Sequence, residues 1–249
     1  MKYLSELTPA EILILTKENV TQQELLKITF IDLLFKQVLK TFEVERQFHV
    51  REKVRVYKYV GIGQNYRHYD SKNHERLFLS TFGTDNTVEI LFTNLVKIAY
   101  QKSITIQDLK NDIIQTPTLK KCFTQNIFQQ FFYGYSFTEY GKELKQKVKK
   151  EIQDAGNQLS DIENIENQKA IELIKIIGAN IFLLVNLNYE LLNQIDKDLA
   201  IQINQTNTND GASGCSTSWS FDDYSSSFDS GCSSGCSGCG SGCSGCGGD

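Results

Sequence analysis

The segment Val54-Arg55-Val56-Tyr57-Lys58-Tyr59-Val60, closed by Gly61-Ile62-Gly63, decides how the first part of this chain is interpreted. Apolar and polar side chains alternate along it, which predicts a β-strand that ends at the glycines. Helix signals precede it, because Thr8-Pro9-Ala10-Glu11 and Thr21-Gln22-Gln23-Glu24 are capping boxes. We therefore expect helices from Pro9 and Gln22, a third apolar helix through Phe30 to Leu39, and then the strand.

Three helices followed by a hairpin is the element order of a winged helix. A second block repeats it, with an apolar helix over residues 88–100, a short strand over 104–106, and a helix over 107–114. A helix from Thr118 to about Gln130 and a wing over 133–138 complete this block. The ten residues 135–144, YSFTEYGKEL, resemble the wing-to-helix ending of many winged-helix proteins.

Helical patterns continue to the end of the body. We expect a helix past Gly141 to about Asp154, another capped by Ser160, a buried apolar run at 181–185, and a last amphipathic helix over 189–199. The predicted fold class is mostly α with small β-hairpin wings: two winged-helix-like blocks, C-terminal helices and a disordered tail. The predicted boundaries are 1–75 for the first block, 76–204 for the second block with its helical extension, and 205–249 for the tail.

The tail differs from the body in composition. No Lys, Arg or His follows Lys197, and ten of the 17 glycines lie from Gly211 onward. Such a segment cannot bury enough apolar surface to fold alone. Five acids in the tail account for the net charge of −4, because the rest of the chain has 25 acidic and 26 basic residues and is nearly neutral.

No apolar run is long enough to span a membrane, since the most apolar stretch, 176–187, contains Gly178, Asn180 and Asn186. The N-terminus carries Glu6 and Glu11 where a signal peptide has an unbroken apolar core. We therefore expect no membrane span and a cytoplasmic protein, in which thiols stay reduced.

Six of the seven cysteines end Ser-Gly-Cys triplets in the tail. From Cys232 the pattern is Cys-x3-Cys-x2-Cys-x3-Cys-x2-Cys, which is too compact for an ordinary zinc finger and favours clustering of soft ions such as Zn or Cu(I). The candidate metal ligands are Cys232, Cys236, Cys239, Cys243 and Cys246. A low-complexity tail that binds no ligand is the alternative.

Every tail cysteine also follows glycine, the residue that least hinders closure of a thiol onto the preceding carbonyl. The segment resembles the core region of thiazole/oxazole-modified microcins, which implies a precursor of a modified peptide. The body is far longer than a usual leader peptide. The whole architecture, a helical body with a Gly/Ser/Cys-rich tail, resembles uncharacterised bacterial proteins; that resemblance implies no activity and no catalytic residue.

A nucleic-acid partner is a further alternative, which the sequence does not favour. The segment from Arg46 to Arg76 contains eight Lys and Arg residues but only three acidic ones, with tyrosines between them. A second basic run begins at Lys142. Against a winged-helix DNA-binding regulator, the net charge is negative and both candidate recognition helices are poor readers of DNA. One is dominated by Phe30, Leu33, Leu34 and Phe35, and the other has only Lys120, Lys121, Gln125 and Gln129 on its polar face.

Signals for an enzyme are weak. His68, Asp70, His74 and Glu75 are close in sequence but lack the spacing of a metalloprotease helix, and Cys122 lies in an apolar pattern typical of a buried residue. We expect no catalytic residue and no cofactor-binding residue. The sequence thus predicts a non-enzymatic binding or scaffold protein whose body docks a protein partner and whose cysteine tail captures soft metal ions.

Overall fold

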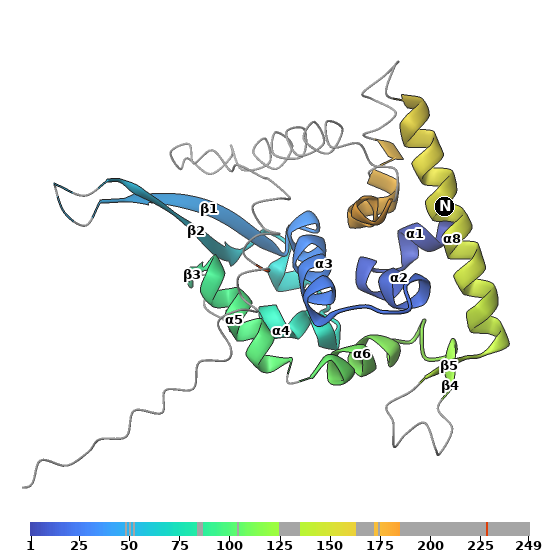
Figure 1. Ribbon diagram of the computed structural model, residues 1–249. Coiled ribbons are helices and arrows are strands. Elements are labelled where there is room, and N and C mark those ends of the chain that lie inside the picture. Colours follow the sequence, from blue (N-terminus) through green and yellow to red (C-terminus); the bar gives the residue numbers. More distant parts are fainter. Residues whose placement is uncertain are drawn as a thin grey trace, which may run out of the picture.

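The computed structural model describes residues 1–47, 49, 51, 53–83, 87–103, 105–124, 135–162, 172–173, 175–184 and 228. These residues form a mostly helical body with two small antiparallel sheets, as expected (Figure 1). The α-helices are α1 (Lys2–Glu6), α2 (Pro9–Thr16), α3 (Gln22–Phe35), α4 (Arg76–Leu79), α5 (Phe92–Lys102), α6 (Ile106–Ile114) and α8 (Glu139–Ile162). The 3₁₀ turns are η1 (Tyr66–His68), η2 (Asn73–Glu75) and η3 (Gly178–Leu183).

Both predicted N-terminal capping boxes are confirmed. The Glu11 backbone N–H donates to Thr8 Oγ1 at 3.4 Å, and the Glu11 carboxylate accepts from the Thr8 N–H at 2.8 Å. Thr21 and Glu24 make the same pair of bonds at the start of α3. The residues that satisfy the first amides of each helix are local in sequence, which is why these starts were predictable.

The expected third helix does not exist as a separate element. α3 runs unbroken from Gln22 to Phe35, and Gln37 then takes a left-handed φ of 54°. The N–H of Gln37 donates to Leu34 O and that of Val38 to Leu33 O, which is the bond pattern of a Schellman ending. The chain therefore turns at Gln37, and Leu39, expected in the helix, begins a strand instead.

The larger sheet has the order β1-β2-β3 and consists of β1 (Leu39–Arg46), β2 (Arg55–Ile62) and β3 (Ile90–Leu91). The predicted strand is thus confirmed as β2, shifted by one or two residues at its ends. Leu39 pairs with Ile62 and Arg46 with Arg55, so β1 and β2 form a long two-stranded ribbon that projects from the helices (Figure 1). Tyr59 pairs with Leu91, which attaches β3 to the base of the ribbon.

Gly63 allows the ribbon to return against the end of α3. A Cβ at this position would lie 2.1 Å from the Gln37 carbonyl oxygen, a separation no side chain tolerates. The Gly63 N–H donates to Val38 O at 2.8 Å in the same close approach. The glycine is therefore required by backbone contact and not by its φ.

The second part of the chain departs from the expected winged-helix order. Thr105, expected in a strand, is the N-cap of α6 and accepts from the Asp108 N–H at 3.1 Å. The residues after Thr118 form turns up to Cys122, not a helix. They lead into the two-stranded sheet of β4 (Phe123–Thr124) and β5 (Ser136–Phe137). Residues 125–134, which include most of the remaining predicted helix, lie outside the described residues.

α8 is longer than predicted, and Ser160, expected to start a new helix, lies within it. The Glu151 carboxylate on α8 accepts from the Tyr3 and Leu4 N–H groups at 2.9 and 3.0 Å. It thereby satisfies free amides in the first turn of α1. The polar side chain of Asn180, on η3, donates to Leu4 O at 2.6 Å and to Leu7 O at 2.9 Å.

The buried apolar side chains form a single core cluster, with α3 at its centre. Ten consecutive positions of α3, residues 25–34, include nine buried ones, so this helix has almost no free face. Ile181, within the predicted apolar run, is fully buried, whereas Phe182 and Leu183 are only partly buried. Among the described helices, none has both the length and the apolar character that crossing a membrane requires.

Candidate functional site

The five predicted metal-binding cysteines, Cys232, Cys236, Cys239, Cys243 and Cys246, lie outside the described residues, as does Cys215. Within the described part of the chain, no group of three or more His, Cys, Asp or Glu side chains is arranged to hold a metal ion. Cys122 is a buried free thiol whose Sγ–H points to Thr118 O at 3.6 Å. Burial raises the pKa of its thiol, which disfavours a reactive thiolate.

The four candidate ligands close in sequence are not brought together. His68 and Asp70 are exposed, whereas His74 and Glu75 are buried in η2. The structure instead places Glu75 in a cluster of charged groups that sequence spacing did not indicate.

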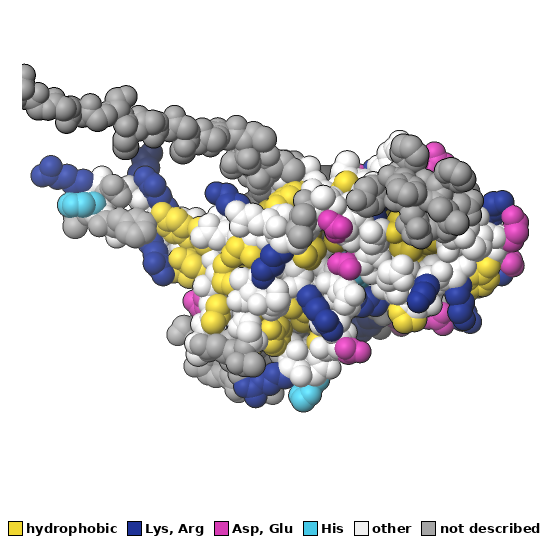
Figure 2. Space-filling view, turned by 90° about the horizontal axis from the view of Figure 1, so that it is seen from below, with side chains coloured by type: hydrophobic (Ala, Val, Ile, Leu, Met, Phe, Trp, Pro, Cys, Tyr) yellow, Lys and Arg dark blue, Asp and Glu magenta, His cyan; other side chains and the backbone are white. Residues whose placement is uncertain are grey.

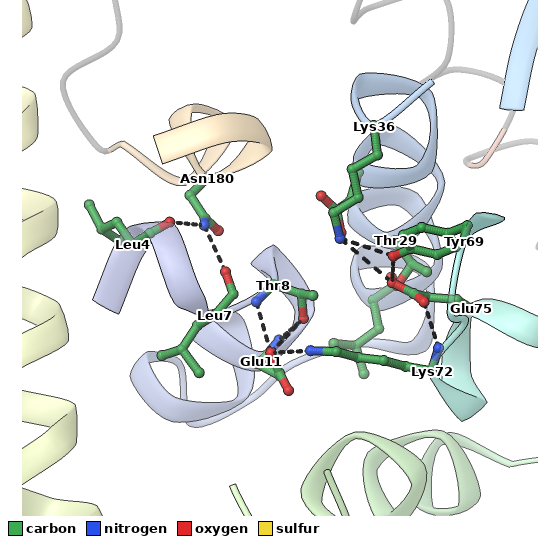
Figure 3. Close-up of polar contacts among 12 residues, drawn as sticks. Leu4, Leu7, Thr8, Glu11, Thr29, Lys36, Tyr69, Lys72, Glu75 and Asn180 are labelled. Atoms are coloured by element: carbon green, nitrogen blue, oxygen red, sulfur yellow. Dashed lines mark hydrogen bonds and ion pairs between the residues drawn. The ribbon is translucent and has the colours of Figure 1, made fainter. Parts of the chain in front are cut away.

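This buried charge cluster lies between α2, α3 and the segment that leads into η2 (Figure 3). The Glu11 carboxylate is fully buried, and Lys72 Nζ donates to its Oε2 at 2.8 Å. The Thr8 hydroxyl donates to the same oxygen at 2.9 Å. Glu11 therefore has two roles, because it caps α2 and also pairs with a lysine 61 residues away. The cluster consists of Glu11, Asp32, Lys36, Tyr69, Lys72 and Glu75.

The second half of the cluster is centred on Lys36, near the end of α3. Lys36 Nζ donates to Asp32 Oδ2 at 2.6 Å and to the Tyr69 hydroxyl at 3.1 Å. The Tyr69 hydroxyl in turn donates to Glu75 Oε1 at 2.7 Å, and Lys36 Nζ lies 3.8 Å from that oxygen. Glu75 Oε2 accepts from the Lys72 N–H at 2.7 Å, which links the two halves of the cluster.

Burial and charge act in opposite directions on these carboxyl groups. Burial raises the pKa of Glu11, but Lys72 and the hydrogen bonds from Lys72 and Thr8 outweigh it, so the pKa lies below its usual value. Burial raises the pKa of Asp32 to about 6 despite the adjacent Lys36. Burial, followed by the charge of Glu75, raises the pKa of the Tyr69 hydroxyl and keeps it protonated.

His74 adjoins this cluster and is held neutral. Burial lowers the pKa of its imidazole to about 3, and the charge of Glu11 opposes that shift only in part. Its Nδ1 has no hydrogen-bond partner among the described residues. Taken together, the lysines of the cluster pair with carboxylates and its tyrosine donates to Glu75, so the arrangement joins three parts of the fold.

The neutral His74 predicts a specific dependence of stability on pH. Because its folded pKa lies below the ordinary value of 6.5, its contribution is complete above pH 6.5 and falls as the pH drops towards 3. The free energy of unfolding should decrease by about 1.4 kcal/mol per pH unit from this group within that window. Asp32, whose pKa is raised, acts oppositely between pH 6 and 3.8.

Comparing wild type with His74→Gln isolates the contribution of His74 to the pH dependence, because Asp32 is present in both proteins. Urea unfolding at several pH values should show a shallower acid loss in the variant, whatever its stability at pH 7. Parallel curves for the two proteins would contradict a buried neutral imidazole at position 74.

The aromatic site that receives Phe228 is the second notable arrangement. Phe228 is the one tail residue that the structure describes, and its side chain is fully buried. Its ring lies 6.0 Å from that of Phe30 on α3 and 5.8 Å from that of Phe92 on α5, centroid to centroid. Phe30 and Phe92 are themselves 5.0 Å apart, and we call this pair the aromatic socket.

Phe228 was not predicted as a functional residue, and its burial changes the interpretation of the tail. The other residues predicted to be disordered lie outside the described residues, but at position 228 the chain is held in the core. The sequence offered one indication that Phe228 is buried: it is an aromatic residue within a Gly/Ser-rich segment. Apolar character alone does not reveal which part of the body receives it.

The basic ribbon, residues 39–62, is the third arrangement. Figure 2 shows Lys and Arg side chains around its projecting end. Its described cations are Lys40, Arg46, Arg51, Lys53, Arg55 and Lys58, and its described acids are Glu43 and Glu45. Glu43 lies 3.7 Å from Lys58, towards the base. At the far end, the sequence of residues 45–55 has four Lys or Arg and two Glu, so this end has an excess of positive charge. Comparison of the chain with protein-family models, curated proteins and solved structures finds no significant match.

Proposed function

We propose that this is a non-enzymatic binding protein whose body holds its own C-terminal segment and positions the cysteines of that segment to capture soft metal ions. The observation that carries the proposal is the burial of Phe228 between Phe30 and Phe92. A tail with no role beside the body has no need of an aromatic anchor in the core. Cys232 follows this anchor closely in the sequence.

The tether length follows from the sequence. Cys232 is four residues after Phe228, and a fully extended chain covers at most about 14 Å over that distance. Cys246 is 18 residues after the anchor. The five thiols lie within 15 residues of sequence, and this density favours shared binding of Zn or Cu(I). The proposal includes a reducing compartment such as the cytoplasm, where thiols remain available.

Metal uptake tests this function directly. Intact-mass spectrometry of natively produced protein should show Zn or Cu that a chelator releases. Replacement of Cys232, Cys236, Cys239, Cys243 and Cys246 by serine should abolish the uptake. Cys122→Ser is the matched control, because it removes a buried thiol and should leave the metal content unchanged.

The same measurement distinguishes the alternatives. A loss of water plus two hydrogens per ring would support a heterocycle-modified, microcin-like precursor instead. An unmodified protein that takes up no metal would contradict both chemical proposals.

The proposal also has a structural part. α2 and α3 followed by β1 and β2 keep the order of helices and then a hairpin, and we propose that the basic ribbon corresponds to a wing. α3 differs from an ordinary recognition helix because it is buried on nearly every side. A partner protein remains part of the proposed function, with the body as its docking surface.

A further inference from the structure

We propose that the projecting end of the basic ribbon is a binding site for double-stranded DNA, contacted by the ribbon and not by a helix. This inference is independent of the metal-binding tail. It begins with the register of the ribbon. Arg46 and Arg55 are direct partners in the antiparallel pairing, so their side chains leave the same face of the ribbon next to each other. Both are exposed to solvent.

The stability of the ribbon does not account for this arginine pair. Like charges directly opposite each other destabilise a two-stranded sheet. No carboxylate among the described residues forms an ion pair with either arginine. Arg51 and Lys53, in the connection between the strands, add two more exposed cations. Such a concentration of positive charge is stabilised when an anion, such as a phosphate group, lies against it.

One of the arginines is already oriented by its neighbours. The Arg46 guanidinium lies 5.6 Å above the ring of Tyr59, and that ring stacks on Phe42 at 5.9 Å with an angle of 16° between the planes. Stacking on a ring limits the conformations of the side chain, so less entropy is lost when it binds a ligand. The planar guanidinium can then donate two parallel hydrogen bonds to a phosphate.

The shape of the element favours duplex DNA over other polyanions. Each strand has eight residues, which corresponds to a length of about 27 Å, and the far end of the ribbon projects beyond α3 and α5, which contact its base (Figure 1). The major groove of B-DNA is about 12 Å wide and admits a two-stranded ribbon.

The negative net charge of the whole chain does not oppose this site. The acidity lies in the tail, and the body alone has 26 bases against 25 acids. The objection to a recognition helix concerns a different surface, since α3 is buried on nearly every side and the proposed site is on the ribbon. The ribbon avoids that objection because its cations contact phosphates, and phosphate contacts need no base-specific helix.

Fluorescence anisotropy with a labelled 20-base-pair duplex and the full-length protein tests the proposal. Four cations at the ribbon end predict that the logarithm of the association constant falls against the logarithm of salt concentration with a slope of about −4. Arg46→Gln with Arg55→Gln should reduce the slope to about −2 and weaken binding about tenfold at low salt. Arg46→Lys with Arg55→Lys keeps the charge and should retain most of the slope.

The matched control is Lys142→Gln with Lys147→Gln on α8. It removes the same charge from an exposed helix face and should leave the slope near −4. Equal losses in the two double variants would overturn the site, because only the total charge would then matter. No binding by wild type at low salt would also overturn it. Binding to phosphatidylserine vesicles that the ribbon arginines control, without DNA binding, would assign the ribbon to a membrane surface and overturn the DNA proposal.

The variants are expected to fold, since both arginines are exposed and their removal relieves a repulsion. Unchanged thermal unfolding of the glutamine variant would confirm that any loss of binding is local.

Discussion

Lys72→Met is expected to destabilise the protein by about 3 kcal/mol at pH 7, because it leaves the Glu11 carboxylate buried without a cation. Glu11 is fully buried, whereas the Lys72 side chain is 32% exposed, so water reaches the pair from the lysine side. The expected loss of unfolding free energy is therefore at the lower end of the range that is typical when one partner of a buried ion pair is removed. Urea unfolding followed by circular dichroism measures the effect.

The chain contains a closely matched control for this pair. Glu24 is also the capping residue of a helix and also pairs with a lysine, Lys17, but this pair is exposed. Lys17→Met should therefore cost less than about 1 kcal/mol. Similar losses for the two variants would show that burial of Glu11 does not decide the energy of its pair.

The pH dependence of the same variant provides a second criterion. Burial, the largest influence on the pKa of Glu11, raises it, and in wild type Lys72 helps to hold it below its usual value. Without the lysine, only hydrogen bonds such as that from Thr8 oppose burial, so the pKa should rise. Protonation then relieves the unpaired charge, so the difference between Lys72→Met and wild type should shrink as the pH falls below about 5. Glu11→Gln added to Lys72→Met should recover part of the lost stability at pH 7.

Phe228→Ala is the second change with a large expected effect. Removal of a fully buried phenylalanine typically costs about 3–5 kcal/mol, and here the segment that carries it would also lose its anchor. We expect the unfolding midpoint to fall and the tail to become accessible to protease. Chymotrypsin is the suitable probe, because no Lys or Arg follows Lys197 and trypsin has no site in the tail.

Cleavage after Trp219, Phe221 or Tyr224 should be faster in Phe228→Ala than in wild type. Phe228→Leu keeps an apolar side chain for the aromatic socket and should lose less than about 1.5 kcal/mol. If alanine and leucine behave alike, or if alanine leaves both stability and cleavage unchanged, Phe228 does not anchor the tail.

Local sequence was sufficient for some elements of the fold. The starts of α2 and α3 were predicted from residues three positions apart, since Thr8 and Glu11, like Thr21 and Glu24, bond to each other's backbone amides. β2 was predicted from its alternation. The division between body and tail stays a prediction from composition, because a segment rich in Gly and Ser has little apolar surface to bury.

Two predicted elements were wrong, because a second local interaction overrode the pattern on which each prediction was based. The apolar residues Val38 and Leu39 continue the pattern of α3, yet a left-handed Gln37 ends the helix before them. A glycine at that position would have signalled the ending. Ile104-Thr105-Ile106 has the composition of a strand, but Thr105 caps α6 because a threonine oxygen also satisfies helix amides.

The sequence by itself determined the helical class of the body, the capped helix starts, the strand β2 and the compact set of cysteines after Cys232. Only the tertiary structure decided that Glu11 meets Lys72, that Arg46 stands opposite Arg55, and that Phe228 reaches the aromatic socket. The physical reason is sequence separation. Capping and alternation act between neighbours, whereas these three contacts join residues that only the packing of the whole body brings within a few ångströms of each other.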